Sequence, residues 1–355
     1  MSTLFSPLQI RSVTVRNRLW VSPMCMYSAV DGVVQDWHHT HLAQFASGGA
    51  GLVIAEATAV VADGRISPRD AGIWTDEQRD AWAPIVKAIH DRGAAAGIQL
   101  AHAGRKASTW WPWAEQRGSV PSAEGGWRTF APSAIGFDGY AEPVALDADG
   151  IDAVVEAFAA AARRSTEAGF DVLEIHAAHG YLLHQFLSPL SNLRDDEYGG
   201  SLENRARLLL RVVDAVRAAV DDDVPVFVRI SATDHADGGF TPEEAETVSG
   251  WASAHGADLI DVSSGGLVAH QRISVFPGYQ VSLAEGVRQG GRIPVTAVGL
   301  ITAAAQAEQV LVDGAADAIF AGREWLRDPH FALRAAHELG AEIVWPPQYD
   351  RARWR

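Results

Sequence analysis

Two histidines and a tyrosine follow a short apolar run in the stretch FDVLEIHAAHGYLLH. His176 and His179 lie three residues apart, and Tyr181 comes two residues later. Imidazole N–H groups can polarise a ligand oxygen, and a phenol can deliver a proton. Side chains three residues apart point to opposite faces of a regular strand, so these rings converge only if the strand breaks at Ala177–Ala178. We therefore expect the strand to end there and both imidazoles to face one ligand.

The same histidines leave two other interpretations open. With His184 nearby they could ligate zinc and form a hydrolase. Against zinc, the first predicted strand ends in SPMC rather than in paired histidines, and no carboxylate stands beside His179. They could also be core histidines bonded to the backbone, although Gly180 interrupts any continued helix. For the separate cluster WHHTH at 37–41, which begins a helix, we expect a solvated or capping role.

Several apolar runs carry polar residues at or near their carboxyl ends. The set comprises Cys25, Glu56, Gln99, His102, His176, His179, Arg229, Asp261 and Ser263. In a (β/α) barrel this end of the strands is the functional face. Arg229 lies within VFVRIS, and a buried guanidinium needs an anionic or carbonyl-rich partner. That partner is either a strand acid, such as Glu56 or Asp261, or an anionic ligand.

The last two predicted strands end near glycines. Gly299 follows VTAV before a helix that we expect Thr302 to cap, and Gly322 and Arg323 follow AIFA. Glycines at strand ends expose backbone N–H groups that suit a phosphate. In barrels the phosphate site often lies after strands seven and eight, so this pairing predicts a phosphate-bearing ligand.

Eight short apolar runs alternate with longer amphipathic stretches, and we predict the runs to be strands. They cover 18–24, 51–57, 97–103, 171–177, 225–231, 257–263, 293–299 and 316–322. Continuous rather than alternating apolar residues are typical of strands buried on both faces. Among the helices, Ser201 and Thr241 are expected N-caps, Pro242 a first helical residue and Gly93 a helix end. The alternation predicts an α/β protein, a (β/α)8 TIM barrel; an open doubly wound sheet is the alternative.

A long connection at 102–148 follows the third predicted strand and so belongs at the barrel mouth. It carries tryptophans between 110 and 127, and we expect at least one of them to form a wall over the substrate rather than only to pack. No linker or repeat divides the chain, so we expect one domain over residues 1–355.

Composition limits the partners and the compartment. The chain has 355 residues and a net charge of −15, which argues against a nucleic-acid partner. Its single cysteine, Cys25, allows no internal disulfide, no cysteine-rich zinc site and no four-cysteine iron–sulfur cluster. The N-terminus lacks the pattern of a signal peptide, and no apolar stretch approaches ~20 residues. We expect a cytoplasmic protein with no membrane partner and no metal.

Several quoted stretches together resemble the Old Yellow Enzyme family of FMN-dependent ene-reductases. They are VRNRLWVSPMCMYS, QLAHAGRK, HAAHGYLLHQFLSPLSNLRDDEYGGSLENR, VSSGGL, FPGYQV and GREWLRDP. The resemblance covers essentially the whole chain, and PMCMYS with the terminal QYDR is similar to the bacterial subclass called thermophilic-like. It implies a single FMN-binding barrel that carries non-covalent FMN and uses NADPH or NADH as a transient reductant.

The resemblance also assigns roles to residues. It implies contacts to the FMN ring and phosphate from Ser22, Pro23, Met24, Cys25, Ala57, Gln99, Arg229, Gly299, Gly322 and Arg323. His176 and His179 would bind the substrate oxygen, Tyr181 would supply a proton and Tyr27 would touch the substrate. Arg229 would then balance negative charge near flavin N1, which explains it better than a salt bridge.

The implied reaction is a conjugate reduction. Hydride from flavin N5 goes to the β-carbon of an activated alkene, an α,β-unsaturated ketone or aldehyde, a maleimide or a nitro compound. A flavin-binding protein without turnover is the third alternative, and the proton donor Tyr181 argues against it.

The C-terminal tail, about 341–355, is expected to cross to a neighbouring subunit. In the subclass an arginine near the C-terminus reaches the neighbour's site; Arg351 matches best, and Arg353 is the alternative. The implied partner is a second copy of the chain, in a homodimer or a dimer of dimers.

Overall fold

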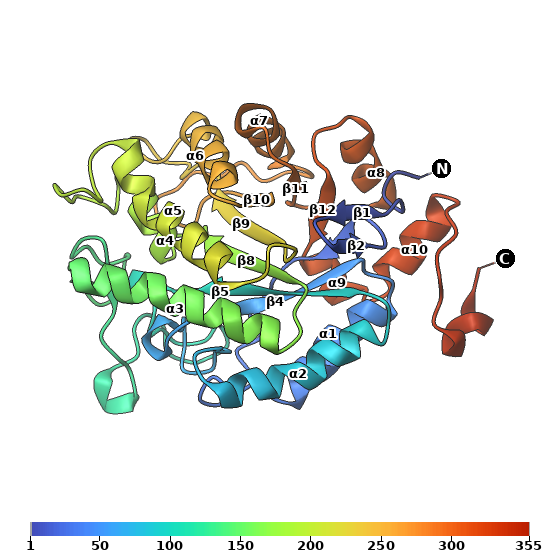
Figure 1. The fold of residues 1–355 in the computed structure, drawn as a ribbon, viewed down its shortest axis with the longest axis horizontal. Coiled ribbons are helices and arrows are strands. Elements are labelled where there is room, and N and C mark those ends of the chain that lie inside the picture. The colour runs from blue at the N-terminus through green and yellow to red at the C-terminus, as the bar shows by residue number, and fades with distance from the viewer. Residues whose placement is uncertain (1, 355) are drawn as a thin grey trace.

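Eight parallel strands close into a barrel in the computed structural model, which describes residues 2–354 (Figure 1). They are β3 (Leu19–Val21), β4 (Leu52–Ala59), β5 (Ala95–Ala101), β8 (Val172–Ala177), β9 (Val226–Ser231), β10 (Leu259–Ser263), β11 (Val295–Ala297) and β12 (Ala318–Ala321). Each strand pairs with the next along the chain, and β12 pairs with β3 to complete the circle. The predicted (β/α)8 barrel is confirmed, and each of the eight predicted runs overlaps one barrel strand; β4 extends two residues beyond its predicted run and β5 begins two residues before its own.

Helices cover the outside of the barrel, as Figure 1 shows. They are α1 (Asp36–Ser47), α2 (Asp76–His90), α3 (Ala148–Glu167), α4 (Leu182–Leu187), α5 (Leu202–Ala219), α6 (Pro242–Ala254), α7 (Val281–Gly291), α8 (Ala304–Val312), α9 (Arg323–Arg327) and α10 (Phe331–Glu338). Ser201 and Thr241 cap α5 and α6 as predicted, and Pro242 is the first residue of α6.

One predicted cap is wrong. Helix α8 begins at Ala304 with Ala303 at the N-cap, so Thr302 lies one residue too early to cap it. The backbone N–H of Thr302 instead donates to Gln306 Oε1 at 3.2 Å. The start of α8 is therefore held by a glutamine from inside the helix, which sequence spacing at Thr302 does not reveal.

The histidine cluster of α1 is largely buried. His38 is fully buried and His41 is 6% exposed, so the expectation of solvated side chains is wrong for both. The capping alternative is confirmed for His38, whose Nδ1 accepts the backbone N–H of Gln35 at 3.0 Å in a capping box. These two positions face the barrel while His39 faces out, because residues 38 and 41 lie on one side of a helix.

An N-terminal hairpin closes the amino end of the barrel. Strands β1 (Leu8–Ile10) and β2 (Val13–Val15) pair antiparallel, and sequence analysis did not predict them. Ile10 and Val15 pack in one cluster with the interior residues Trp20 and Phe227. With its amino end plugged in this way, the barrel is open to ligands at the carboxyl end of the strands.

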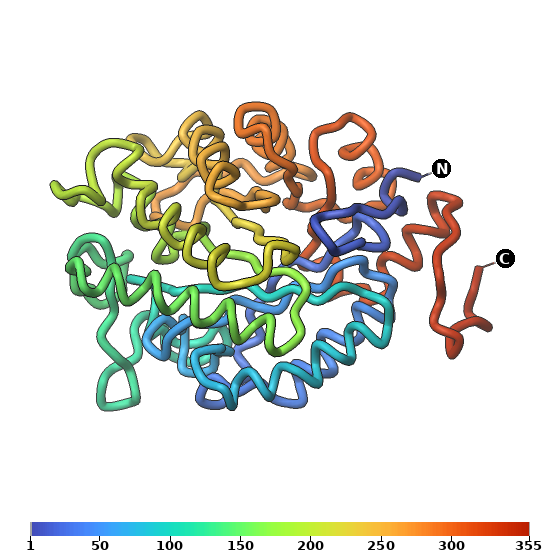
Figure 2. The backbone as a smooth tube through the Cα atoms, viewed as in Figure 1, coloured from blue at the N-terminus to red at the C-terminus, as the bar shows by residue number. Residues whose placement is uncertain are grey.

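The connection after β5 is long, as predicted, and contains little regular structure. It holds η2 (Gly104–Lys106), η3 (Ser122–Glu124) and the short pair β6 (Phe130–Ala131) and β7 (Val144–Ala145). Figure 2 shows this segment, in teal and green, at the end of the molecule away from both termini. Within residues 2–354, no helix is both long enough and apolar enough to cross a membrane.

Candidate active site

The strand that carries the histidine pair breaks where the spacing predicts. Strand β8 ends at Ala177, and His179 adopts a left-handed backbone with φ +58°. This turn brings the His176 and His179 rings to a centroid distance of 5.1 Å, nearly perpendicular to each other. The backbone N–H of His179 donates to Ser231 Oγ at 2.9 Å, which fixes the turn against β9. The two imidazoles therefore lie side by side at the carboxyl end of the barrel.

Hydrogen bonds set which ring nitrogens remain for a ligand. His176 Nδ1 accepts the backbone N–H of Ala178 at 3.3 Å, so in the neutral ring the proton is assigned to Nε2. His179 Nε2 lies 2.7 Å from Ser263 Oγ, and a hydroxyl that donates there leaves the proton on Nδ1. Each ring then retains one N–H group that no residue of its own turn uses.

Both imidazoles are neutral at ordinary pH. Burial lowers the pKa of His176 and of His179 well below the usual value, and the charge of Arg229 lowers both further. Neutral rings are hydrogen-bond donors without being fixed cations. The pair can therefore polarise an oxygen that is neutral in the ground state and gains charge during reaction.

Tyr181 stands next to the pair at the N-cap of α4. Its ring lies 5.0 Å from that of His176, and burial raises the pKa of the phenol well above its usual value. The phenol thus keeps its proton until a stronger base forms beside it.

Tyr27, the other predicted substrate contact, has φ +48° and lies edge-on to Trp113 at 5.7 Å. Tyr27 and Trp113 line one hollow of about 540 Å³, and Trp113 is 59% exposed.

Lys106 ties the histidine turn to the loop after β10. Its Nζ donates to the carbonyl oxygens of His179 (2.9 Å) and Gly266 (2.8 Å). Burial lowers the pKa of the Lys106 amine to about 8. The stretch QLAHAGRK places Lys106 directly after a predicted strand end, and this position is the signal in the sequence that could have predicted its role.

Arg229 has a strand acid as partner and also lines a crevice. Its Nε lies 2.8 Å from Asp261 Oδ2, although the angle is not that of a hydrogen bond, and its Nη2 donates to Ser22 Oγ at 3.2 Å. The salt bridge to Asp261 is therefore present, and Arg229 also lines the crevice in which a ligand could bind. Glu56, the other candidate acid, instead accepts the backbone N–H of Met26 at 3.1 Å.

The crevice beside Arg229 collects six of the ten predicted cofactor residues. It has a volume of about 240 Å³, and these six are Ser22, Met24, Arg229, Gly299, Gly322 and Arg323. Ser263 also lines it, so the crevice adjoins the histidine turn. Of the other four predicted residues, Ala57 and Gln99 are register partners on β4 and β5, and Pro23 and Cys25 follow β3. The backbone N–H of Ala57 bonds the Cys25 thiol, whose pKa burial raises.

The residues of the crevice fit riboflavin phosphate. Gly299 has φ +120°, and a Cβ there would stand 2.9 Å from Gln280 Nε2. A Cβ at Gly322 would stand 3.4 Å from Met24 Sδ, another lining residue. Gly299 therefore needs glycine, because of its positive φ and the close approach of Gln280, whereas a Cβ at Gly322 would make only an ordinary van der Waals contact. Two guanidinium groups line the crevice. The one of Arg229 could contact the ring system of the cofactor, and the one of Arg323, next to Gly322, could contact its phosphate.

His184 does not converge with the histidine pair, which disfavours the zinc interpretation. His184 is fully buried; its Nδ1 accepts the backbone N–H of Gly180 at 2.9 Å and its Nε2 lies 2.9 Å from Asp234 Oδ1. No group of three or more His, Cys, Asp or Glu side chains in residues 2–354 is placed to hold a metal ion. The pair therefore lacks a third ligand of the usual kind.

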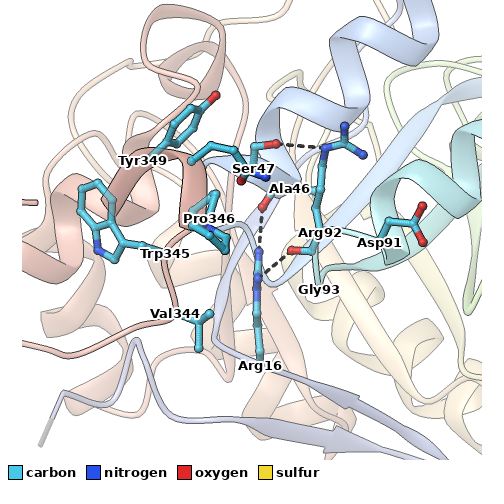
Figure 3. Close-up of a pocket in the computed structure, with 12 residues that line it drawn as sticks. Arg16, Ala46, Ser47, Asp91, Arg92, Gly93, Val344, Trp345, Pro346 and Tyr349 are labelled. Atoms are coloured by element: carbon cyan, nitrogen blue, oxygen red, sulfur yellow. Dashed lines mark hydrogen bonds between the residues drawn. The ribbon is translucent and has the colours of Figure 1, made fainter. Parts of the chain in front are cut away.

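The C-terminal tail lies far from this mouth in its own chain. Its short helix η4 (Pro347–Ala352) sits beside α10, at the end of the molecule away from the long connection (Figure 1). A cavity of about 890 Å³ separates Val344–Tyr349 from Arg16, Arg92 and the ends of α1 and α2 (Figure 3). Arg351 and Arg353 are exposed, and Arg353 pairs with Asp350 at 2.9 Å. Arg351 thus does not join the site of its own chain.

Comparisons with known proteins agree with this geometry. The family model described as NADH:flavin oxidoreductase / NADH oxidase matches residues 3–342. An NADPH dehydrogenase of Listeria innocua is 50% identical over 358 residues, all of both chains, and one of Bacillus subtilis is 48% identical over 98% of each. Among solved structures, a morphinone reductase gives a TM-score of 0.80 at 31% identity, covering 98% of this chain and 92% of that one. An Old Yellow Enzyme homologue from Zymomonas mobilis gives 0.77 at 28% identity, covering 99% of each.

Proposed function

Because the chain belongs to the NADH:flavin oxidoreductase / NADH oxidase family, the family of Old Yellow Enzyme, we propose that this oxidoreductase is an FMN-dependent ene-reductase. Its substrates would be activated alkenes: α,β-unsaturated ketones and aldehydes, maleimides and nitroalkenes. The observation that carries the proposal is the neutral pair His176 and His179, whose rings lie 5.1 Å apart at the carboxyl end of the barrel, with the protonated phenol of Tyr181 5.0 Å from the ring of His176.

The histidine pair binds the carbonyl or nitro oxygen of the substrate. One N–H from each ring donates to that oxygen and withdraws electrons from the conjugated double bond. As the β-carbon is reduced, negative charge grows on the same oxygen, and the two fixed donors stabilise that charge without reorganisation. The Ser231 and Ser263 contacts and the Lys106 bridge hold His179 in its left-handed turn during this change.

Tyr181 supplies the proton to the α-carbon. Its high pKa keeps the phenol protonated in the resting site, and a carbanion-like α-carbon is basic enough to take that proton. Tyr27 and Trp113 would form the aromatic wall on the other side of the substrate.

The crevice holds the cofactor. Ser22, Pro23, Met24, Cys25, Ala57 and Gln99 would lie along the ring, Arg229 would balance charge at its N1 edge, and Gly299, Gly322 and Arg323 would bind the phosphate. Bound at these residues, FMN would supply the redox chemistry, which is hydride transfer from the reduced nicotinamide to the β-carbon of the alkene. The reductant would be NADPH, because the similar proteins of Listeria innocua and Bacillus subtilis are named NADPH dehydrogenases. NADPH would bind transiently at the barrel mouth.

An anaerobic absorbance titration tests the proposal. The purified protein should be yellow, bleach on addition of NADPH and regain its colour when cyclohexenone is added. Tyr181→Phe should bleach normally but regain colour ~10²-fold or more slowly, because it has lost the proton donor. The matched control is Tyr198→Phe. The Tyr198 phenol accepts from Arg211 on the outer helix α5, so its loss should leave the rates of bleaching and recolouring unchanged.

Two results would contradict the proposal. A colourless protein with stoichiometric zinc would favour the hydrolase. A yellow protein that bleaches but is reoxidised by no enone, maleimide or nitroalkene would assign it to another electron acceptor.

A further inference from the structure

A row of polar side chains crosses the inside of the barrel just below the mouth. Gln99, Glu174, Arg229, Asp261 and Thr296 come from the neighbouring strands β5, β8, β9, β10 and β11. Glu174, Asp261 and Thr296 are fully buried, Gln99 is 2% exposed and Arg229 is 6% exposed. The row therefore holds one guanidinium and two carboxyl groups away from solvent.

The contacts assign the guanidinium to one of the two acids. Asp261 Oδ2 lies 2.8 Å from Arg229 Nε, and Asp261 Oδ1 accepts from Thr296 Oγ1 at 2.7 Å. Asp261 thus has both a positive charge and a hydroxyl donor against it. Burial raises the pKa of Asp261, but the charge of Arg229 and the Thr296 hydroxyl oppose this rise, so Asp261 is the better placed of the two acids to be ionised.

Glu174 has a neutral partner on one oxygen and none on the other. Its Oε1 accepts from Gln99 Nε2 at 2.7 Å, and its buried Oε2 has no hydrogen-bond partner. A second ionised acid here would leave the row with a net buried negative charge and an unsolvated oxygen, which proteins avoid by keeping the acid protonated.

We propose that Glu174 is a positioning residue that keeps its proton in the working enzyme and acts on the cofactor site through Gln99. Its carbonyl oxygen holds the Gln99 NH2 group down into the barrel and so fixes the orientation of the amide. Its neutral state leaves the Arg229–Asp261 pair without excess negative charge below the flavin. The inference rests on the proposed function, because it places FMN above Gln99 and Arg229.

The surrounding charges agree with a neutral Glu174. The pKa of Glu174 is raised to about 8: burial and then the charge of Asp261 raise it, while Arg229 and the Gln99 bond oppose them. Arg229 faces Glu174 from β9, Asp261 from β10, and β5 contributes the uncharged amide of Gln99. Glu174 should therefore ionise only above about pH 8.

The test is the midpoint potential of bound FMN in the full-length enzyme and in Glu174→Gln, measured from pH 6 to pH 10. Reduction adds negative charge to the cofactor, so an ionised Glu174 lowers the potential. We expect the two proteins to have the same potential and the same FMN dissociation constant at pH 6 to 7. Above about pH 8 the wild-type potential should fall below that of the variant.

Glu56→Gln is the matched control. Glu56 is also a buried acid at a strand end, and burial raises its pKa to about 8, but it bonds the backbone of Met26 rather than Gln99. Because Glu174 still ionises in Glu56→Gln, this variant should keep a fall in potential above about pH 8, whereas Glu174→Gln should lose the part of the fall that Glu174 contributes. If Glu56→Gln abolishes the fall, or if Glu174→Gln already differs from wild type at pH 6, the proton does not reside on Glu174 and the inference is wrong.

Infrared spectroscopy gives a second readout that can be used even if Glu174→Gln does not fold. With side-chain 13C-labelled glutamate, the Glu56→Gln protein should show a protonated carboxylic-acid carbonyl band that disappears above about pH 8. Its absence would overturn the inference. A preparation that binds no FMN would instead refute the proposed function. A yellow enzyme that lacks the carboxylic-acid carbonyl band, or whose potential above about pH 8 equals that of Glu174→Gln, would refute only the role of Glu174.

Discussion

At the scale of single residues, burial removes the basicity of histidines both at the mouth and in α1. His41 packs against Phe45, with the two rings 4.8 Å apart, and is 6% exposed. Its pKa is lowered to about 4, chiefly by burial and to a smaller extent by His38. In the unfolded chain the pKa returns to about 6.5, so the unfolded state binds the proton first as pH falls.

The sign of the pH effect follows. The stability that a neutral His41 supports is complete above pH 6.5 and is lost as pH falls toward 4, at roughly 1.4 kcal/mol per pH unit. His41→Leu should therefore reduce the slope of unfolding free energy against pH, between pH 6.5 and 4, by about one proton. Denaturant unfolding at several pH values between 4 and 6.5 measures this slope. His39→Leu, at the exposed neighbouring position, should leave the slope unchanged; an unchanged slope in His41→Leu would mean that its ring is already hydrated or charged in the fold.

At the scale of elements, two loops approach so closely that each needs a glycine. A Cβ on Gly180 would stand 2.3 Å from the carbonyl oxygen of Gly266, and a Cβ on Gly266 would stand 2.6 Å from His179 Cα. Both glycines have positive φ, and Lys106 bridges the same two loops. The position of the His179 ring is therefore set by the loop after β10 as much as by β8.

Gly266→Ala tests this dependence against a control with the same backbone strain. Gly266 has φ +92° and Gly125 has φ +90°, but a Cβ at Gly125 meets nothing within 4 Å. Gly125→Ala should cost about 1 kcal/mol of unfolding free energy and leave ligand affinity unchanged. Gly266→Ala should cost more and weaken the binding of a phenol or enone by tenfold or more, because it displaces His179. Equal effects of the two variants would show that the loop contact does not position the ring.

Sequence patterns predicted the elements better than the contacts between them. Continuous apolar runs identified the barrel strands because burial on both faces requires such runs. The hairpin β1–β2 was missed because three residues per strand carry no readable alternation. The break at Ala177 followed from the spacing of His176 and His179, whereas the bonds to Ser231 and Ser263 come from β9 and β10 and depend on barrel closure. The exposure expected for His41 failed because residue type alone does not show which side of α1 faces the barrel.

At the scale of the whole molecule, the tail and the mouth lie at opposite ends of one chain. The mouth carries the long connection, while residues 344–349 stand off the body across a cavity at the amino-end side of the barrel (Figure 3). Trp354 stacks on His337 at 4.9 Å, which holds the end of the tail near α10. An arginine in this tail can serve a site only in another copy of the chain, so we propose a homodimer or a dimer of dimers in which Arg351 crosses. Arg353 is the weaker choice because it is already paired with Asp350.

Hybrid dimers test the crossing directly. Removal of residues 349–355, or Arg351→Ala, should weaken ligand binding, and Tyr181→Phe should abolish proton delivery within its own barrel. In a co-expressed mixture of Arg351→Ala and Tyr181→Phe chains, the barrel with an intact Tyr181 receives an intact Arg351 from its partner. Enone reduction should then recover to about one quarter of wild type, since about half of the dimers are hybrids with one complete site each. Recovery no greater than the average of the two parent proteins would show that the tail serves its own chain or no site at all, and the same experiment with Arg353→Ala decides between the two arginines.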